Sequence, residues 1–204
     1  MGSEFLTSPF DNLLKPVDDH LIVHNELMSS LILGNKIQIH SSEHGIPDLD
    51  TTRIVIIGIP ENRNSIDYLG DELNLNEIRK SFYNLYPGNW STEIADLGNL
   101  ILGENVEQTY GRIISMLSIL FEKNIIPIII GGSHDLLYAN YRAYDSFKST
   151  VNIVNIDSNF DIGDSAKPIN NLSYLGKIIL DEPHNLFNYS NLGYQTYHNS
   201  QEEI

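Results

Sequence analysis

Residues 125–135 decide the fold, and they read IIPIIIGGSHD. The first six positions hold five isoleucines. A run that is apolar at nearly every position is typical of a strand buried in a parallel sheet. Gly131 and Gly132 then let the backbone turn sharply, and Ser133 or Asp135 can cap a following helix. The stretch therefore predicts a strand, a tight turn and a helix, with His134 beyond the carboxyl end of the strand.

Similar apolar runs occur twice more, because residues 53–60 read RIVIIGIP and residues 151–156 read VNIVNI. Weaker strand candidates lie at 93–97, 178–180 and 194–198. Apolar residues recur three and four positions apart in four segments, which predicts helices over residues 18–33, 74–86, 106–123 and 136–147. Strands that alternate with helices predict an α/β fold of three layers, a parallel sheet with helices on both faces. Functional residues in such folds lie beyond the carboxyl ends of the strands.

The charge balance excludes several classes of partner. The 204 residues include 27 acidic and 12 basic side chains, which gives a formal net charge of −15. Such a chain repels nucleic acid and anionic membranes. No cysteine is present, so disulfides and thiolate metal sites are excluded. The longest apolar run is far shorter than the ~20 residues that cross a bilayer, and no signal-peptide pattern is visible. We expect a cytoplasmic protein.

The length allows one large domain or a fragment of one. Residues 1–50 mix Pro, His and Asp with a single helical segment, which favours an N-terminal appendage. Residues 1–5, MGSEF, resemble translated linker sequence. The main α/β domain is expected over residues 51–204.

A second polar cluster, DSNFD at 157–161, follows the strand at 151–156. Alternate positions of an extended segment face the same side, so Asp157, Asn159 and Asp161 can converge. Three oxygen-bearing side chains near the histidine of a neighbouring strand end suit a divalent cation such as Mn²⁺. The alternative for each cluster taken alone is structural: an Asx-rich turn at 157–161 and a helix-capping turn at 131–135.

These clusters complete a pattern that resembles the ureohydrolases, the family of arginase, agmatinase and formimidoylglutamase. The matching stretches are residues 54–60, NEIR at 76–79, DLG at 96–98, GGSH at 131–134 and DSNFD at 157–161. The resemblance implies an arginase-like α/β domain that is incomplete at its C-terminus. It also implies a pair of Mn²⁺ ions that activate water for attack on a guanidinium or formimino carbon.

Residue by residue, His134, Asp157 and Asp161 match metal ligands of the family. Asn159 stands where the family has a second ligating His, which predicts weaker metal binding. The segment NLSYLG at 171–176 lacks the His that the family carries in an Asn-Leu-His-Gly-like stretch. The later Asp-x-Asp motif that supplies the last two family ligands is not found before Ile204. The catalytic residues therefore remain unknown, and the 204-residue chain alone is expected to be inactive.

Two functions from different classes follow from this pattern. The first is hydrolysis of a small guanidino or formimino substrate, of the arginase or formimidoylglutamase type. The second is a catalytically inactive scaffold with the same fold, and an unrelated α/β domain is a third reading. An incomplete parallel sheet would have an open edge, so either the chain is a fragment or this surface is buried in a partner, and a homo-oligomer is expected. The remaining histidines are expected to have surface or packing roles: His20, His24, His40, His44, His184 and His198.

Overall fold

The computed structural model describes residues 9–10, 12–68, 73–89, 91–164 and 166–204. The linker-like residues 1–5 lie outside this part. Two compact units make up the chain. The first contains Met1–Pro60, Leu73–Glu104 and Ile119–Gly131; the second contains Glu61–Glu72, Asn105–Ser118 and Gly132–Ile204. The division near residue 50 expected from the sequence stays a prediction.

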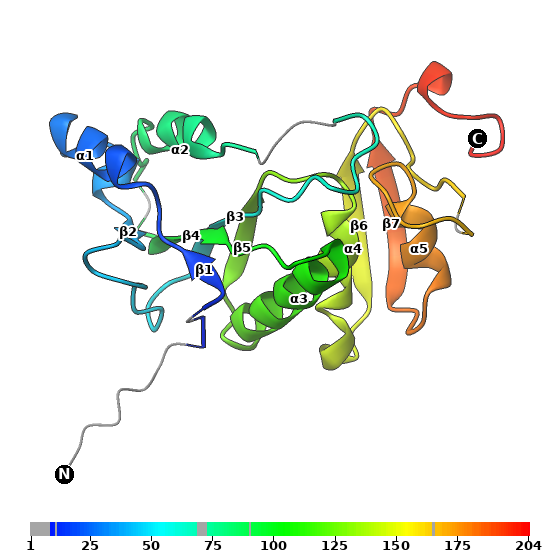
Figure 1. Ribbon diagram of the computed structural model, residues 1–204, viewed down its shortest axis with the longest axis horizontal. Coiled ribbons are helices and arrows are strands. Elements are labelled where there is room, and N and C mark those ends of the chain that lie inside the picture. Colours follow the sequence, from blue (N-terminus) through cyan, green and yellow to red (C-terminus); the bar gives the residue numbers. More distant parts are fainter. Residues whose placement is uncertain (1–8, 11, 69–72, 90, 165) are drawn as a thin grey trace, which may run out of the picture. The chain divides into compact units, whose positions relative to one another are not determined.

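The first unit is built on a mixed sheet with β3 (Ile54–Gly58) at its centre. This strand pairs in parallel with β4 (Ile94–Leu100) on one side and with β5 (Ile126–Ile130) on the other (Figure 1). The short strands β1 (Leu14–Lys15) and β2 (Gln38–Ile39) also pair with β4, β1 antiparallel and β2 parallel. The predicted parallel strands are therefore confirmed, and the antiparallel β1 was not foreseen.

Strands β3 and β5 differ in how far their side chains are buried. Val55, Ile56 and Ile57 of β3 are fully buried, as the apolar run predicts. In β5, however, the side chain of Ile126 is 62% exposed and that of Ile128 is 43% exposed, so the prediction of a buried strand is wrong there. Ile126 and Ile128 are two positions apart and so project from the same face of the sheet, which is exposed at β5, the edge strand among the described strands.

The helices of this unit are shorter than predicted. Helix α1 spans Asp19–Leu27 and α2 spans Asn76–Tyr83, and a single 3₁₀ turn, η1 (Leu33–Asn35), follows α1. The face that α2 buries carries Arg79 and Tyr83, whereas Ile78 is half exposed. The cause is Asp96 of β4, a fully buried carboxylate that the Arg79 guanidinium contacts at 2.9 Å.

Helix α3 (Val106–Glu122) matches the prediction closely. Ile113, Leu117 and Leu120 of its apolar stripe are fully buried. Its residues are shared between the two units. Within the described ranges, no helix is both long and apolar enough to span a membrane.

The second unit contains a two-stranded parallel sheet of β6 (Val151–Ile156) and β7 (Leu186–Leu192) (Figure 1). Its helices are α4 (Leu136–Arg142) and α5 (Tyr174–Leu180), with short 3₁₀ turns η2 (Asp145–Phe147) and η3 (Thr196–His198). One face of the sheet packs on these helices, since Ile153 clusters with Tyr141, Tyr174 and Ile178. The opposite face is open, and Ile156 is 82% exposed.

Two strand predictions in this unit are wrong. Residues 178–180 form the end of α5, where Ile178 is fully buried by the helix packing just described. Residues 194–198 contain η3, and the strand of this region is β7, six to eight residues earlier. A polar sequence, LFNYSNL, concealed β7, because three of its seven residues are Asn or Ser and no apolar run marks it.

Candidate metal centre

The turn that carries His134 begins with two glycines, as predicted. Gly131 and Gly132 have φ angles of +82° and +85°, in the left-handed region that favours glycine. Helix α4 then starts at Leu136, so His134 lies just before its first turn. The predicted capping is wrong in its detail. Asp135 occupies the N-cap position, but its carboxylate accepts hydrogen bonds from the hydroxyls of Ser133 and Tyr110 and does not cap the helix.

The buried residue Glu61 supports this turn through its backbone. Glu61 is fully buried, and its backbone carbonyl accepts a 2.9 Å hydrogen bond from the Ser133 amide. Its side chain accepts from the hydroxyl of Thr109 and from the guanidinium of Arg63. Burial acts to raise the pKa of Glu61, but the hydrogen bonds from Arg63 and Thr109 lower it overall. The backbone that presents His134 is therefore fixed by charged and polar contacts.

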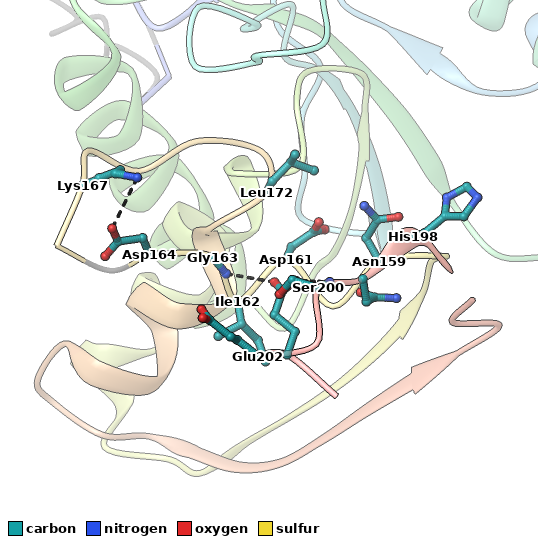
Figure 2. Close-up of a pocket in the computed structure, with 12 residues that line it drawn as sticks. Asn159, Asp161, Ile162, Gly163, Asp164, Lys167, Leu172, His198, Ser200 and Glu202 are labelled. Atoms are coloured by element: carbon teal, nitrogen blue, oxygen red, sulfur yellow. Dashed lines mark hydrogen bonds and ion pairs between the residues drawn. The ribbon is translucent and has the colours of Figure 1, made fainter. Parts of the chain in front are cut away.

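The loop that follows β6 carries the other predicted ligands. Asp161 has a φ angle of +57°, a left-handed conformation that is uncommon for a residue other than glycine. A cavity of about 660 Å³ opens beside this loop. Figure 2 shows Asn159 and Asp161 on its wall, together with Asp164, Lys167 and His198. Two of the candidate residues thus face a space large enough for a small ligand.

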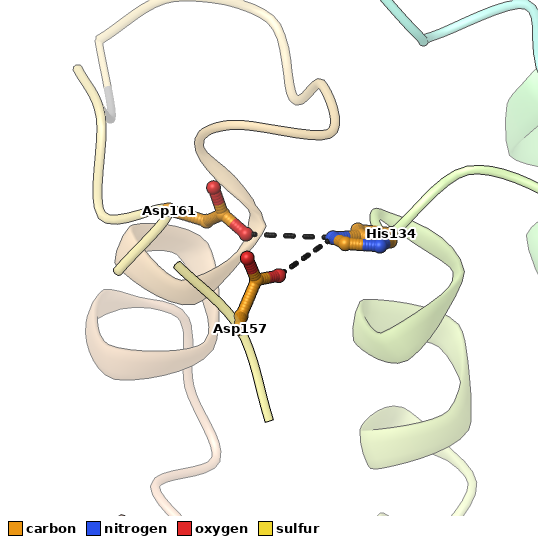
Figure 3. A group of neighbouring side chains, drawn as sticks. All are labelled: His134, Asp157 and Asp161. Carbon is orange, nitrogen blue, oxygen red and sulfur yellow. Dashed lines mark ion pairs between the residues drawn. The ribbon is translucent and has the colours of Figure 1, made fainter. Parts of the chain in front are cut away.

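His134, Asp157 and Asp161 converge on one point (Figure 3). The Nδ1 atom of His134 lies 3.0 Å from Oδ2 of Asp157 and 3.6 Å from Oδ2 of Asp161. One potential ligand atom from each residue falls within 4.8 Å of the other two. The side chain of His134 is 61% exposed and that of Asp157 is 12% exposed, so solvent reaches the group. The structure thereby brings together three of the four residues singled out from the sequence.

The carboxylate of Asp161 is buried without a hydrogen bond from the described part of the chain. The residue is 2% exposed, and neither carboxylate oxygen accepts a hydrogen bond from any described residue. A buried anion without hydrogen bonds is costly, so such groups are paired or coordinate metals. An imidazole and two carboxylates are also the donors that Mn²⁺ and similar divalent cations accept. The side chains present therefore fit a divalent cation.

The carboxylates also act on the protonation of His134. The facing carboxylate of Asp161 raises the pKa of the imidazole most, and the charge of Asp157 adds to this effect. Partial burial opposes the shift, but the net pKa is higher than that of an ordinary histidine. Without metal, the two carboxylates therefore favour the protonated form of the imidazole.

Asn159 is placed differently from its neighbours in the loop. Its amide Oδ1 accepts a 2.7 Å hydrogen bond from the hydroxyl of Ser158, and its backbone amide donates to Asp157. Residues that the sequence did not single out also contribute. The ring of Tyr174 meets His134 edge to face, and Asn199 contacts the backbone of the loop. No local spacing marks either residue, because the contacts that bring them to the site join residues about forty positions apart in the sequence.

Comparisons with known proteins bear on this geometry. The Arginase family model matches residues 52–204, about three quarters of the chain. The chain belongs to the arginase family. A formimidoylglutamase from Macrococcus caseolyticus is 30% identical over 120 residues, which cover 56% of this chain and 37% of that protein.

Solved structures show the same fold. A formiminoglutamase from Trypanosoma cruzi, determined with Mn²⁺, has a TM-score of 0.68 at 17% identity, over 84% of this chain and 60% of that one. A formimidoylglutamase from Bacillus subtilis has a TM-score of 0.64 at 18% identity, over 81% and 60%. The arginase-like α/β class predicted from the sequence is confirmed. The chain covers 60% of each of these two solved structures and 37% of the Macrococcus protein.

Proposed function

We propose that this chain carries part of the Mn²⁺ centre of an arginase-family hydrolase that acts on a small linear amidine, of the formimidoylglutamase type. The observation that carries the proposal is the buried carboxylate of Asp161, which lacks hydrogen bonds and faces both His134 and Asp157. Membership of the family and the likeness to formimidoylglutamases support the substrate class. Assembly into a homo-oligomer and a cytoplasmic location stay predictions.

Each residue has a distinct part in this proposal. His134 Nδ1 and one oxygen from each carboxylate would hold the ion. When bound, Mn²⁺ supplies Lewis acidity for attack of water on the amidine carbon. The contacts of Asp135 with Ser133 and Tyr110 fix the turn of His134, so that the imidazole stays directed at the carboxylates.

A second candidate, an inactive scaffold of the same fold, is favoured by one observation. The only side-chain oxygen of Asn159 already accepts a hydrogen bond from Ser158. A neutral amide oxygen in this state is a poorer ligand than the imidazole that the family has at this position. On this account the residues keep their positions while the affinity for metal is lost.

Titration with Mn²⁺, followed by calorimetry and by the EPR signal of the free ion, separates the two candidates. The first predicts one bound equivalent in the wild type and about tenfold tighter binding, about 1.4 kcal/mol, in Asn159→His. The matched control is Asp164→Asn, which changes an exposed carboxylate on the same cavity and should bind as the wild type does. Less than about a tenth of an equivalent bound at about 1 mM Mn²⁺ would leave the scaffold as the function.

A further inference from the structure

The last segment of the described chain, residues 195–203, contacts the loop that carries the two aspartates. The side-chain amide of Asn199 bonds to this loop in both directions. Its Oδ1 accepts a 2.7 Å hydrogen bond from the Phe160 amide, and its Nδ2 donates to the Ser158 carbonyl at 2.9 Å. Asn199 thus holds the backbone on both sides of Asn159, as a paired strand would.

Glu203 makes a second attachment further along the loop. One carboxylate oxygen accepts a 3.1 Å hydrogen bond from the amide of Gly163, and the other accepts from the amide and hydroxyl of Ser200. Burial acts to raise the pKa of Glu203, but these hydrogen bonds lower it overall. The contact to Gly163 lies two residues beyond Asp161, on the opposite side from the contact of Asn199.

The loop requires such support, because it lacks regular secondary structure and contains the left-handed Asp161. That conformation is sterically less favourable for a residue with a Cβ than for glycine. Two further contacts leave little freedom: the Asn191 side chain donates to the Asn159 carbonyl, and the Leu175 amide donates to the Asp161 carbonyl.

We infer that Asn199 and Glu203 are positioning residues, which hold loop 157–163 in the conformation that directs Asp157 and Asp161 at one point. Neither residue touches the candidate ligand atoms, so the effect passes through the backbone. The inference rests on the proposed metal centre for its functional meaning. The conformation of the loop, however, is measurable without any metal.

The experiment compares wild type with Asn199→Ala and Asn199→Asp. Alanine removes all the contacts of the side chain, whereas aspartate keeps the acceptor for the Phe160 amide and loses the donor to the carbonyls of Ser158 and Gln195. The control is Asn188→Ala, an exposed asparagine of β7. In metal-free protein, hydrogen exchange of the Phe160 amide should accelerate at least tenfold in Asn199→Ala and less in Asn199→Asp. In the Mn²⁺ titration, Asn199→Ala should lose about 10–100-fold in affinity, as is usual for residues that orient metal ligands.

These measurements test the positioning role of Asn199 separately from the proposed metal centre. Unchanged protection of the Phe160 amide in Asn199→Ala, with the circular dichroism of the wild type, would overturn the positioning role. Equal Mn²⁺ affinity in wild type and Asn199→Ala would do the same. If the wild type binds no Mn²⁺, the proposed function fails, and the exchange rates alone decide whether Asn199 holds the loop. If Asn199→Ala does not fold, Asn199→Asp provides both measurements.

Discussion

Asp96 of the first unit and Asp161 of the second are both buried, but their carboxylates have different surroundings. In the first unit, Asp96 accepts hydrogen bonds from Arg79, from the hydroxyl of Tyr83 and from the amide of Gly98. In the second unit, Asp161 is equally buried but accepts no hydrogen bond from the described residues. The carboxylate of Asp96 is bonded by a guanidinium, a hydroxyl and an amide, whereas that of Asp161 has only the His134 imidazole as an ion-pair partner among the described residues, at 3.6 Å.

This difference separates a structural carboxylate from one suited to a ligand. Burial of an ion is compensated only when its geometry is good and its remaining lone pairs are bonded, which describes Asp96. Within the described ranges, Asp161 is buried without hydrogen bonds and is paired only with the exposed His134, so a bound cation would add the compensation that this carboxylate lacks. Arg79 also bonds to the side chain of Asn99 and the carbonyl of Gly98, so its guanidinium links helix α2 to strand β4 at several points.

The largest expected effect comes from breaking the satisfied cluster. Arg79→Met leaves the Asp96 carboxylate buried without its cation, and we expect the free energy of unfolding to fall by about 3–5 kcal/mol. Urea unfolding followed by circular dichroism measures the change. Lys80→Met, which removes an exposed charge from the same helix, should stay within about 0.5 kcal/mol of wild type. Equal stability of Arg79→Met and Lys80→Met would show that Asp96 does not depend on this partner.

Asp161→Asn, unlike Arg79→Met, should not lower the free energy of unfolding of the metal-free chain. At about pH 9, well above the ordinary pKa of histidine, the substitution removes a buried charge that has no hydrogen bond. We expect the metal-free chain to unfold at the same or slightly higher urea concentration, with a gain of up to about 1 kcal/mol. Asparagine tolerates the left-handed backbone that this position requires, so strain does not obscure the result.

Addition of Mn²⁺ completes this test. At about 100 times its Kd the ion should stabilise the wild type by about 2.7 kcal/mol, and Asp161→Asn should lose this gain. Asp164→Asn serves as the control and should keep it. A loss of more than about 2 kcal/mol in metal-free Asp161→Asn would mean that the carboxylate is structural, as Asp96 is.

The sequence predicted those features that depend on residues close together in the chain. The double glycine turn, the buried run of β3, helix α3 and the convergence of His134 with Asp157 and Asp161 were all predicted. Their signals are local: positive φ angles, apolar runs, helical periodicity and the ends of parallel strands. For the same reason, the Arg79 and Asp96 pair was missed, because burial of a charged residue depends on a partner seventeen positions away.

The remaining errors also have physical causes. Strand β7 was missed because contacts of Leu186 and Tyr189 with the cluster around Ile153, and not an apolar run, hold it in place. The exposure of β5 and of one face of β6 follows from their pairing, which composition does not encode. Asn199 was missed because its role consists of hydrogen bonds to backbone groups about forty positions earlier.

The smallest expected effect is the dependence of stability on the protonation of His134. Asp96 of the first unit has an arginine as its partner and not a histidine, so the comparison concerns the second unit alone. Because Asp161 and Asp157 raise the pKa of His134, its protonated form stabilises the folded, metal-free chain. This contribution is fully present below the pKa of an unfolded histidine and is lost as the pH rises through the higher folded pKa. NMR titration of the imidazole should show the raised value in wild type and in Asp164→Asn, and a lower value in Asp157→Asn. A pKa of His134 that is the same in Asp157→Asn as in wild type would mean that the two side chains are not in contact in solution, and the convergence seen in Figure 3 would lose its chemical meaning.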